Sequence, residues 1–310
     1  MSKVLITGGG GFCGLHLVRY LKEQGVEVHT LGVKAGGNAS DRHHGITDVT
    51  NAEAIATILE TVQPNYIFHL AGVASAPSAA MFYQVNASYA AALLQAMDLS
   101  GLAATVPTML VGTSAEYGAI EPEQVPIHEL TPVSPYHHYG ISKLAQTHMG
   151  MAAARTGNPL IMVRPFNIIG PGMPPHLSVQ SFAQQVVNSI QNRQDPTIAV
   201  GNLGSSRDFI DIAEVVQIYW QLIQNPQAYG QIINVCSGQG VVMADLLQLM
   251  IKLSGLAITV KFDPQRFKAL DIPVHYGCTK KLTSLLGRSP QFDLQETIQG
   301  ILADLLGRSQ

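Results

Sequence analysis

Tyr139 and Lys143 are the residues whose types and spacing most clearly point to chemistry. They stand four positions apart in a segment that we predict to be helical, so their side chains share one face. A free tyrosine has a pKa of about 10 and is a poor acid–base catalyst at neutral pH. A nearby ammonium stabilises the phenolate, and lowering its pKa by about three units requires roughly 4 kcal/mol of differential interaction. The pair therefore indicates proton transfer in a partly desolvated site, although Tyr and Lys also occur at this spacing by chance.

The hydroxyl residues Thr113 and Ser114 directly follow an apolar strand that we predict over 107–112. This is the fourth predicted strand of the chain, and the Tyr139–Lys143 pair comes after it. That order, behind a glycine turn at the start of the chain, favours a catalytic interpretation of the pair over a chance one.

A glycine cluster lies between the first predicted strand and the amphipathic segment Leu15–Gln24. In a dinucleotide-binding turn, Gly8 would let the chain turn, Gly11 would let the backbone approach a pyrophosphate, and Gly14 would let the helix pack. The helix then directs its free N–H groups and positive dipole end at the phosphates. The turn therefore predicts cofactor binding, with a flexible glycine loop as the alternative.

The end of the second predicted strand, 26–31, bears on the choice of cofactor. Enzymes that prefer NAD usually place an acidic residue there, on the adenosine ribose. Here Gly32 takes that place and Lys34 follows, so no carboxylate repels a 2′-phosphate and one ammonium could attract it. We therefore favour NADP(H) over NAD(H), while Lys34 as a solvated surface lysine stays an alternative. Asp48 is a candidate for the adenine edge.

Strands and helices are predicted to alternate through the first half of the chain. This alternation predicts an α/β fold with a doubly wound parallel sheet of Rossmann type, forming a dinucleotide-binding domain over 1–165. After Pro165 the pattern breaks into shorter elements, which predict a smaller C-terminal substrate-binding lobe over 166–310, partly interwoven with the first. The strands are expected at 65–70, 107–112 and 159–164, and the helices at 51–62, 86–99 and 136–156.

Composition excludes several classes of protein. Net charge is −3 at pH 7 without a long basic run, which argues against a nucleic-acid partner. Lys252 and Lys261 interrupt the most apolar C-terminal region, and the N-terminus has no signal-peptide pattern, so no membrane association is expected. The cysteines Cys13, Cys236 and Cys278 form neither a metal spacing nor a disulfide framework, so we expect a cytoplasmic protein without a metal.

Four motifs are spread over the chain, namely Thr7–Gly14, His69–Gly72, Tyr139–Lys143 and Arg164–Asn167. They resemble those of the extended short-chain dehydrogenases/reductases, the NAD-dependent epimerase/dehydratase family, and the resemblance covers essentially the whole chain. It implies that Thr113 hydrogen-bonds the sugar, that Tyr139 donates the proton, and that Lys143 binds the nicotinamide ribose and lowers the tyrosine's pKa.

The resemblance also implies which residues contact the cofactor and the substrate. Arg207 would hold a diphosphate, because its fork gives bidentate, charge-assisted bonds, and an ion pair with Asp208 or Asp211 is the alternative. The implied cofactor contacts are Gly8, Gly11, Phe12, Cys13, Lys34, Asp48, Leu70, Ala71, Gly72, Tyr139, Lys143 and Pro165. The implied substrate contacts are Thr113, Ser114, Asn167, Asn202 and Arg207.

The segments 164–172, 200–209 and 234–238 resemble the family members that reduce the C4 keto group of GDP-4-keto-6-deoxy-D-mannose with NADPH, giving GDP-D-rhamnose. Ala115 supports this, because the family's dehydratases carry an acid at that position and its epimerase–reductases a cysteine. Glu116 is expected to face away from the site.

The resemblance leaves other functions open. A UDP-sugar 4-epimerase with tightly held NAD is one alternative, and a non-catalytic nucleotide-sensing scaffold on the same fold is another. The substrate is expected to be a nucleotide-sugar, GDP-linked in the favoured interpretation. A homodimer is expected, because family members pair through a helix bundle that includes the helix bearing Tyr139.

Overall fold

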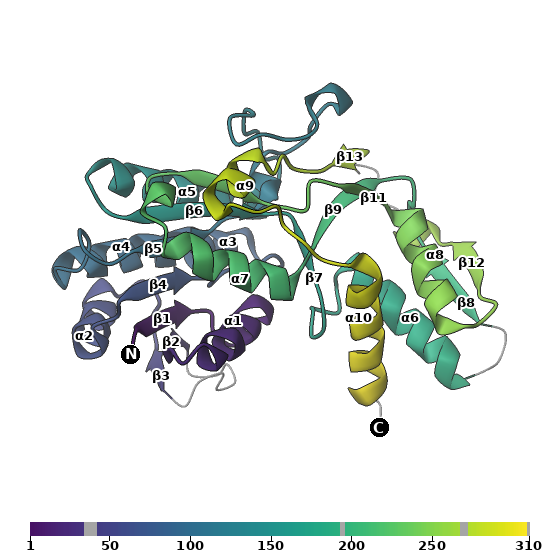
Figure 1. Ribbon diagram of the computed structural model, residues 1–310, viewed down its shortest axis with the longest axis horizontal. Helices are drawn as coiled ribbons and strands as arrows, with labels where there is room; N and C mark the ends of the chain where they lie inside the picture. The colour runs from purple at the N-terminus through teal and green to yellow at the C-terminus, as the bar shows by residue number, and fades with distance from the viewer. Residues whose placement is uncertain (34–41, 193–195, 267–271, 309–310) are drawn as a thin grey trace.

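The computed structural model describes residues 1–33, 42–192, 196–266 and 272–308, and a seven-stranded sheet forms its centre (Figure 1). The strands follow the spatial order β10-β6-β5-β4-β1-β2-β3, and all neighbours pair in parallel. The predicted α/β fold with a doubly wound parallel sheet is therefore confirmed. The strands are β1 Lys3–Thr7, β2 Glu27–Val33, β3 His43–Ile46, β4 Tyr66–His69, β5 Thr108–Val111, β6 Leu160–Pro165 and β10 Ile232–Val235.

Helices cover both faces of this sheet, so its strands are apolar on both sides. On β1, Val4 and Ile6 pack into the core shared with α1 and α7, whereas Leu5 packs into the core under α2 and α4. All of these side chains are completely buried. The covering helices are α1 Phe12–Glu23, α2 Ala52–Val62, α4 Tyr89–Leu99, α5 His138–Arg155, α7 Ile212–Ile223 and α9 Lys280–Leu286.

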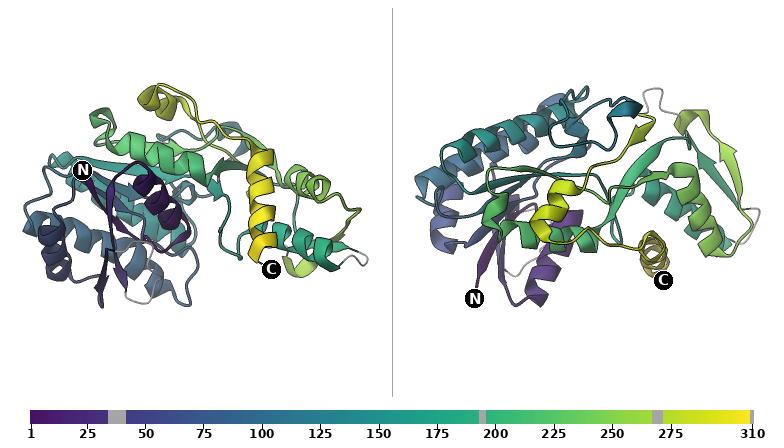
Figure 2. Two further views of the ribbon diagram at one scale, coloured as in Figure 1. Left: turned by 60° about the horizontal axis from the view of Figure 1, so that its bottom comes forward. Right: turned by 45° about the horizontal axis from the view of Figure 1, so that its top comes forward.

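A smaller lobe stands beside the large sheet, with α10 at the junction (Figure 2). It has its own core, in which side chains of α6, α8 and α10 pack together. Its strands are β7 Asn167–Ile169, β8 Thr197–Val200, β9 Ser206–Asp211, β11 Gly240–Val242, β12 Thr259–Phe262 and β13 Val274–His275. Its helices are α6 Ser178–Asn192, α8 Met243–Ser254 and α10 Leu294–Arg308.

The C-terminal half of the chain does not stay in the smaller lobe. Strand β10 pairs with β6 in the large sheet, and α7 packs against α1. The chain therefore passes between the two parts more than once, and a division at residue 165 stays a prediction.

Several short elements connect the longer ones. None of the helices in the described segments combines the length and apolarity that crossing a membrane requires. The short elements are α3 Ala79–Tyr83, the π-helical turn Gln84–Ser88 and the 3₁₀ turns Ser114–Glu116, Pro122–Gln124, Pro226–Ala228 and Pro264–Arg266.

Glu116 ties together the elements around the end of β5. Its side chain is completely buried and pairs with Arg164 of β6 at 2.8 Å. Its other oxygen accepts hydrogen bonds from the Thr113 backbone N–H and from the Thr147 hydroxyl of α5, both at 3.0 Å. Burial raises the pKa of Glu116, and the Arg164 charge acts in the opposite direction. One carboxylate therefore joins β5, β6 and α5.

Replacing Arg164 with Met should leave this carboxylate buried without its cation. We expect R164M to lower the free energy of unfolding by about 3 kcal/mol or more, measured by urea denaturation at pH 7. The loss should grow as pH rises above about 4, because the unfolded chain then ionises Glu116 more readily than the folded one. The double variant E116Q/R164M is the control and should recover part of the loss. A pH-independent loss of less than about 0.5 kcal/mol would contradict this account.

Candidate active site

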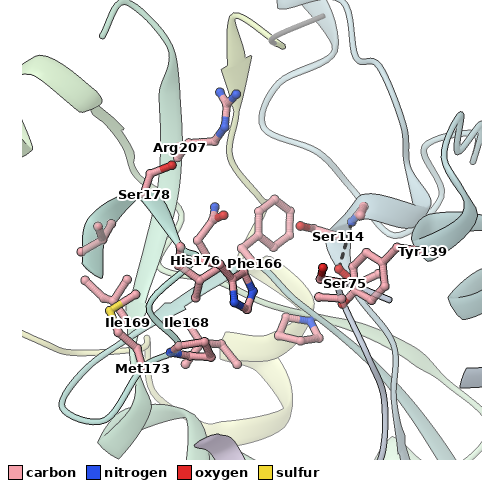
Figure 3. A pocket seen from close by; sticks show the side chains of 18 of the residues that line it. Ser75, Ser114, Tyr139, Phe166, Ile168, Ile169, Met173, His176, Ser178 and Arg207 are labelled. Carbon is pink, nitrogen blue, oxygen red and sulfur yellow. Dashed lines mark hydrogen bonds between the residues drawn. The ribbon is translucent and has the colours of Figure 1, made fainter. Parts of the chain in front are cut away.

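A cavity of about 1040 Å³ opens where the strands of the large sheet end (Figure 3). Gly8, Leu70, Thr113 and Pro165 line it, at or just after the carboxyl ends of β1, β4, β5 and β6. The facing wall comes from the smaller lobe and includes Arg207. This is the place where open parallel sheets bind ligands, since adjacent strand ends and loops leave a crevice there.

Most of the residues predicted for the site meet in this cavity, although the chain separates them widely. Ala71 does not line it, and neither does Asp48, whose carboxylate accepts hydrogen bonds from the backbone and hydroxyl of Thr50. Lys34 lies outside the described residues. The predicted residues that line the cavity are Gly8, Gly11, Phe12, Cys13, Leu70, Gly72, Thr113, Ser114, Tyr139, Lys143, Pro165, Asn167, Asn202 and Arg207.

The glycine turn has the shape that a dinucleotide pyrophosphate requires. Gly8 adopts a φ of +73°, and a Cβ there would lie 2.7 Å from the Ala71 backbone. A Cβ on Gly14 would collide with the Gly8 carbonyl oxygen, so α1 can approach β1 only with glycine at this position. Helix α1 begins beside the cavity and has no acidic residue in its first turn. These residues fit a nicotinamide dinucleotide, with its phosphates at the helix N-terminus.

Tyr139 is half-buried near the start of α5, and its hydroxyl is hydrogen-bonded to Thr113. Burial raises the pKa of Tyr139, and the bond to Thr113 acts in the opposite direction. Ser75 and Ser114 line the same cavity and are drawn beside Tyr139 in the view of Figure 3. Helix α5 starts here because the His137 ring accepts a hydrogen bond from the Gly140 N–H at 3.0 Å.

Lys143 is almost completely buried, with 4% of its surface exposed. Its ammonium donates to the Val111 carbonyl at 2.8 Å and to the Gln146 side chain at 3.0 Å. Burial lowers the pKa of Lys143 to about 8, and Glu116 acts in the opposite direction. A Cβ on Gly72 would lie 2.8 Å from this ammonium, so glycine makes room for it. That Lys143 lowers the pKa of Tyr139 stays a prediction.

Asn86 is a positioning residue that the sequence reasoning missed. It is completely buried in the π-helical turn, and its amide accepts from the Val73 N–H at 2.8 Å and donates to the Val73 carbonyl at 3.1 Å. The same amide donates to the Ser142 hydroxyl at 2.9 Å. It thus holds a cavity-lining loop against α5. The sequence signal for Asn86 was a polar residue within an Ala- and Leu-rich segment that is predicted to be helical. The structural signal is its place in a π-helical turn, since such turns often mark functional sites.

The smaller lobe supplies the residues predicted to hold the substrate. Arg207 donates from one guanidinium nitrogen to the carbonyls of Ser206 and Ile272. Both alternative partners of Arg207 have other roles. The Asp208 carboxylate accepts from the backbone N–H groups at residues 237, 238 and 277, and the Asp211 carboxylate caps α7. Arg207 lines the cavity, where a guanidinium is suited to bind an anionic group.

Replacing Lys143 with Met should remove a buried ammonium. The pKa of about 8 lies below the ordinary value of about 10.4, so the folded state holds the proton less tightly than the unfolded state. This cost is complete below pH 8 and disappears as pH rises through 10. We expect K143M to raise the free energy of unfolding by about 1–3 kcal/mol at pH 7, with little gain at pH 10, measured by urea denaturation.

The exposed Lys252 of α8 provides a matched control, because K252M should change stability by less than about 0.5 kcal/mol. The Val111 carbonyl keeps a hydrogen bond from Gln146 in K143M, so it is not orphaned. A less stable K143M at pH 7 would mean that the hydrogen bonds of the ammonium outweigh its burial.

Comparisons with known proteins find relatives that match almost the whole length of this chain. The chain is 28% identical to the GDP-6-deoxy-D-mannose reductase of Pseudomonas aeruginosa, over 98% of this chain and 97% of that protein. It is 29% identical to the GDP-6-deoxy-D-talose 4-dehydrogenase of Aggregatibacter actinomycetemcomitans, over 98% and 96%. Its structure is similar to that of RMD from Pseudomonas aeruginosa complexed with NADPH, with a TM-score of 0.88 and 26% identity, covering 99% and 100% of the chains.

A family model described as "NAD dependent epimerase/dehydratase family" matches residues 4–236. The match extends from β1 to the residue after β10, so it contains the glycine turn and the Tyr139–Lys143 pair. The predicted family is therefore confirmed: the chain belongs to the NAD-dependent epimerase/dehydratase family of nucleotide-binding enzymes.

Proposed function

We propose that this protein uses NADPH to reduce the C4 keto group of GDP-4-keto-6-deoxy-D-mannose, giving GDP-D-rhamnose. The observation that carries the proposal is one cavity with the hydrogen-bonded Thr113 and Tyr139 at one end and Arg207 at the other. The proposal is also supported by full-length similarity to a GDP-6-deoxy-D-mannose reductase and to the structure of RMD complexed with NADPH.

Each residue of the site has a separate role in this proposed reduction. Tyr139 gives its proton to the C4 oxygen. Burial raises the pKa of Tyr139 and keeps the phenol protonated at neutral pH, but it also makes the phenol a weaker acid, so the transfer relies on nearby positive charge to stabilise the phenolate. Thr113 holds the Tyr139 hydroxyl and polarises the same carbonyl. Lys143, with a pKa of about 8, orients the ribose and can return a proton to the tyrosine. NADPH, bound over the glycine turn, supplies the hydride.

The composition of the cavity wall disfavours a dehydratase, an enzyme that eliminates water from its sugar substrate. Among the described residues that line the cavity there is no aspartate or glutamate. Ala115 contributes only a methyl group, and Glu116 is turned into the protein against Arg164. Without a carboxylate to remove a proton from carbon, the site is suited to hydride and proton transfer at one carbonyl.

The face of the C4 carbonyl that receives the hydride determines the configuration of the product at C4. Reduction of the same ketosugar from the opposite face gives the 6-deoxy-talose epimer, and one relative, at 29% identity, is a GDP-6-deoxy-D-talose 4-dehydrogenase. Analysis of the product's C4 configuration distinguishes the two. A rhamno product is the outcome we propose.

We also propose a cytoplasmic homodimer. The free cysteines Cys13, Cys236 and Cys278 suit a reducing compartment. Ile141 on α5 and Met81 on the neighbouring α3 are exposed apolar side chains, which suit a helix-mediated interface that includes α5.

The proposed function is tested by following the loss of NADPH absorbance when GDP-4-keto-6-deoxy-D-mannose is added to purified protein. UDP- and dTDP-linked ketosugars and NADH are measured in parallel. Rapid oxidation with the GDP-linked sugar supports the proposal. No turnover with any ketosugar, despite tight cofactor binding, would leave the epimerase and the scaffold as the leading functions.

Replacing Tyr139 with Phe removes the proton donor and little else. We expect Y139F to lower kcat about a hundredfold or more, because proton transfer to the C4 oxygen loses its acid. NADPH binding, measured by fluorescence titration, should change less than about threefold and serves as the control for folding. Unchanged turnover would exclude Tyr139 as the acid.

Gly32, at the end of β2, allows a test of cofactor choice. A Cβ there has no heavy atom of the described residues within 4 Å, so a side chain fits without moving any of them. We expect G32D to raise the KM for NADPH about tenfold and to leave the KM for NADH nearly unchanged, because the carboxylate repels a 2′-phosphate. G32N has the same shape without the charge and is the control. Equal effects of both variants would mean that the 2′-phosphate lies elsewhere.

A further inference from the structure

His275 lies in the wall of the cavity formed by the smaller lobe, and the proposed function has given it no role so far. It is the last residue of β13, which pairs in parallel with β9 so that His275 is the register partner of Arg207. Register partners on adjacent strands point to the same face of a sheet. His275 and Arg207 therefore present their side chains to the same part of the cavity, where both are lining residues.

The contacts of the His275 ring place it between the two ends of the cavity. It packs against Phe166 with ring centroids 5.2 Å apart, and it is hydrogen-bonded to the Ser114 backbone. In Figure 3, Phe166 lies between Arg207 on one side and Ser114 and Tyr139 on the other. The ring of His275 thus connects the lobe that carries Arg207 with the loop that carries the reacting hydroxyls.

His275 is 5% exposed, and this burial determines its charge. Burial lowers the pKa of His275 to about 4, the positive charge of Arg207 acts in the same direction, and hydrogen bonds to backbone groups, including Ser114, act against them. At neutral pH the ring is therefore neutral, with one N–H donor and one acceptor nitrogen. Such a ring can hydrogen-bond a hydroxyl group without attracting an anion away from Arg207.

The chemistry of the substrate defines what this ring would meet. If the proposed function holds, the diphosphate on C1 lies near Arg207 and the C4 carbonyl lies at Thr113 and Tyr139. The hexose then spans the distance between them, past Phe166 and His275. A 4-keto-6-deoxy-hexose carries free hydroxyls only at C2 and C3, while its C6 is a methyl group. The polar edge of the sugar suits His275, and its apolar edge suits a ring such as Phe166.

We propose that His275 is a specificity-determining residue that hydrogen-bonds the C2 or C3 hydroxyl of the hexose and so aligns C4 with Tyr139. The inference rests on the proposed function for the direction in which the substrate lies. In this proposal His275 binds the sugar, whereas Arg207 binds the diphosphate.

The test compares the binding of GDP-mannose with that of GDP by isothermal titration, in the presence of saturating NADP⁺. The ratio of the two Kd values measures what the hexose contributes, and it does not depend on turnover. We expect H275L to weaken GDP-mannose about tenfold and GDP less than about twofold, because one hydrogen bond to the sugar is lost. H275Q, which keeps a donor and an acceptor, should recover part of the ratio.

Val274 provides the matched control, since it precedes His275 on β13 and does not line the cavity. V274A should leave the ratio unchanged, and NADPH affinity should report correct folding of every variant. Equal weakening of GDP and GDP-mannose by H275L, or no weakening, would overturn the proposal.

The UDP/UDP-glucose and dTDP/dTDP-glucose pairs are titrated in the same way. If the wild-type protein binds one of these pairs instead of the GDP pair, the proposed function fails. The role of His275 is then decided by the hexose ratio on the nucleotide that binds, with the same expected and contradicting outcomes.

Discussion

The buried carboxylate of Glu116 holds the catalytic elements of this protein in one arrangement. It joins the backbone at Thr113, the hydroxyl of Thr147 on α5 and the guanidinium of Arg164 on β6. Tyr139 and Lys143 belong to the same helix as Thr147, so this carboxylate helps to set their distance from Thr113. Burying a charge is costly unless every oxygen has a partner, and here both oxygens have one. The Glu116–Arg164 ion pair thus helps to fix β6 and α5 around Tyr139, the proposed proton donor.

The electrostatics of the cavity depend on the burial of its titratable side chains and on the charges of the described residues that line it. Burial raises the pKa of Tyr139, so its phenol stays protonated at neutral pH, and burial lowers the pKa of Lys143 to about 8, well below that of a free lysine. The lining residues of the described segments include no carboxylate, which leaves the cavity favourable to a cofactor and a substrate that both carry phosphates. Burying the Lys143 ammonium is expected to cost stability, as groups placed in functional sites often do.

The smaller lobe completes the site through strand pairing. The pairing of β9 with β13 sets Arg207 beside His275, and the pairing of β7 with β9 sets Asn167 beside Phe209, all four on the cavity wall. The lobe therefore offers one charged group and one neutral polar group at neighbouring positions. A nucleotide-sugar has the matching order, with a diphosphate next to a hydroxylated ring.

The parallel α/β fold, the glycine turn and the Tyr139–Lys143 pair could be predicted from the sequence, because they depend on local periodicity and on residues a few positions apart. The partner of Glu116, which lies 48 residues further along the chain, and the hydrogen bonds between Asn86 and Val73 became visible only in the folded chain. The same is true of the position of Asp48 outside the cavity wall and of His275 beside Arg207. These relations arise from strand register and from packing between distant elements, and no local pattern of residue types encodes them.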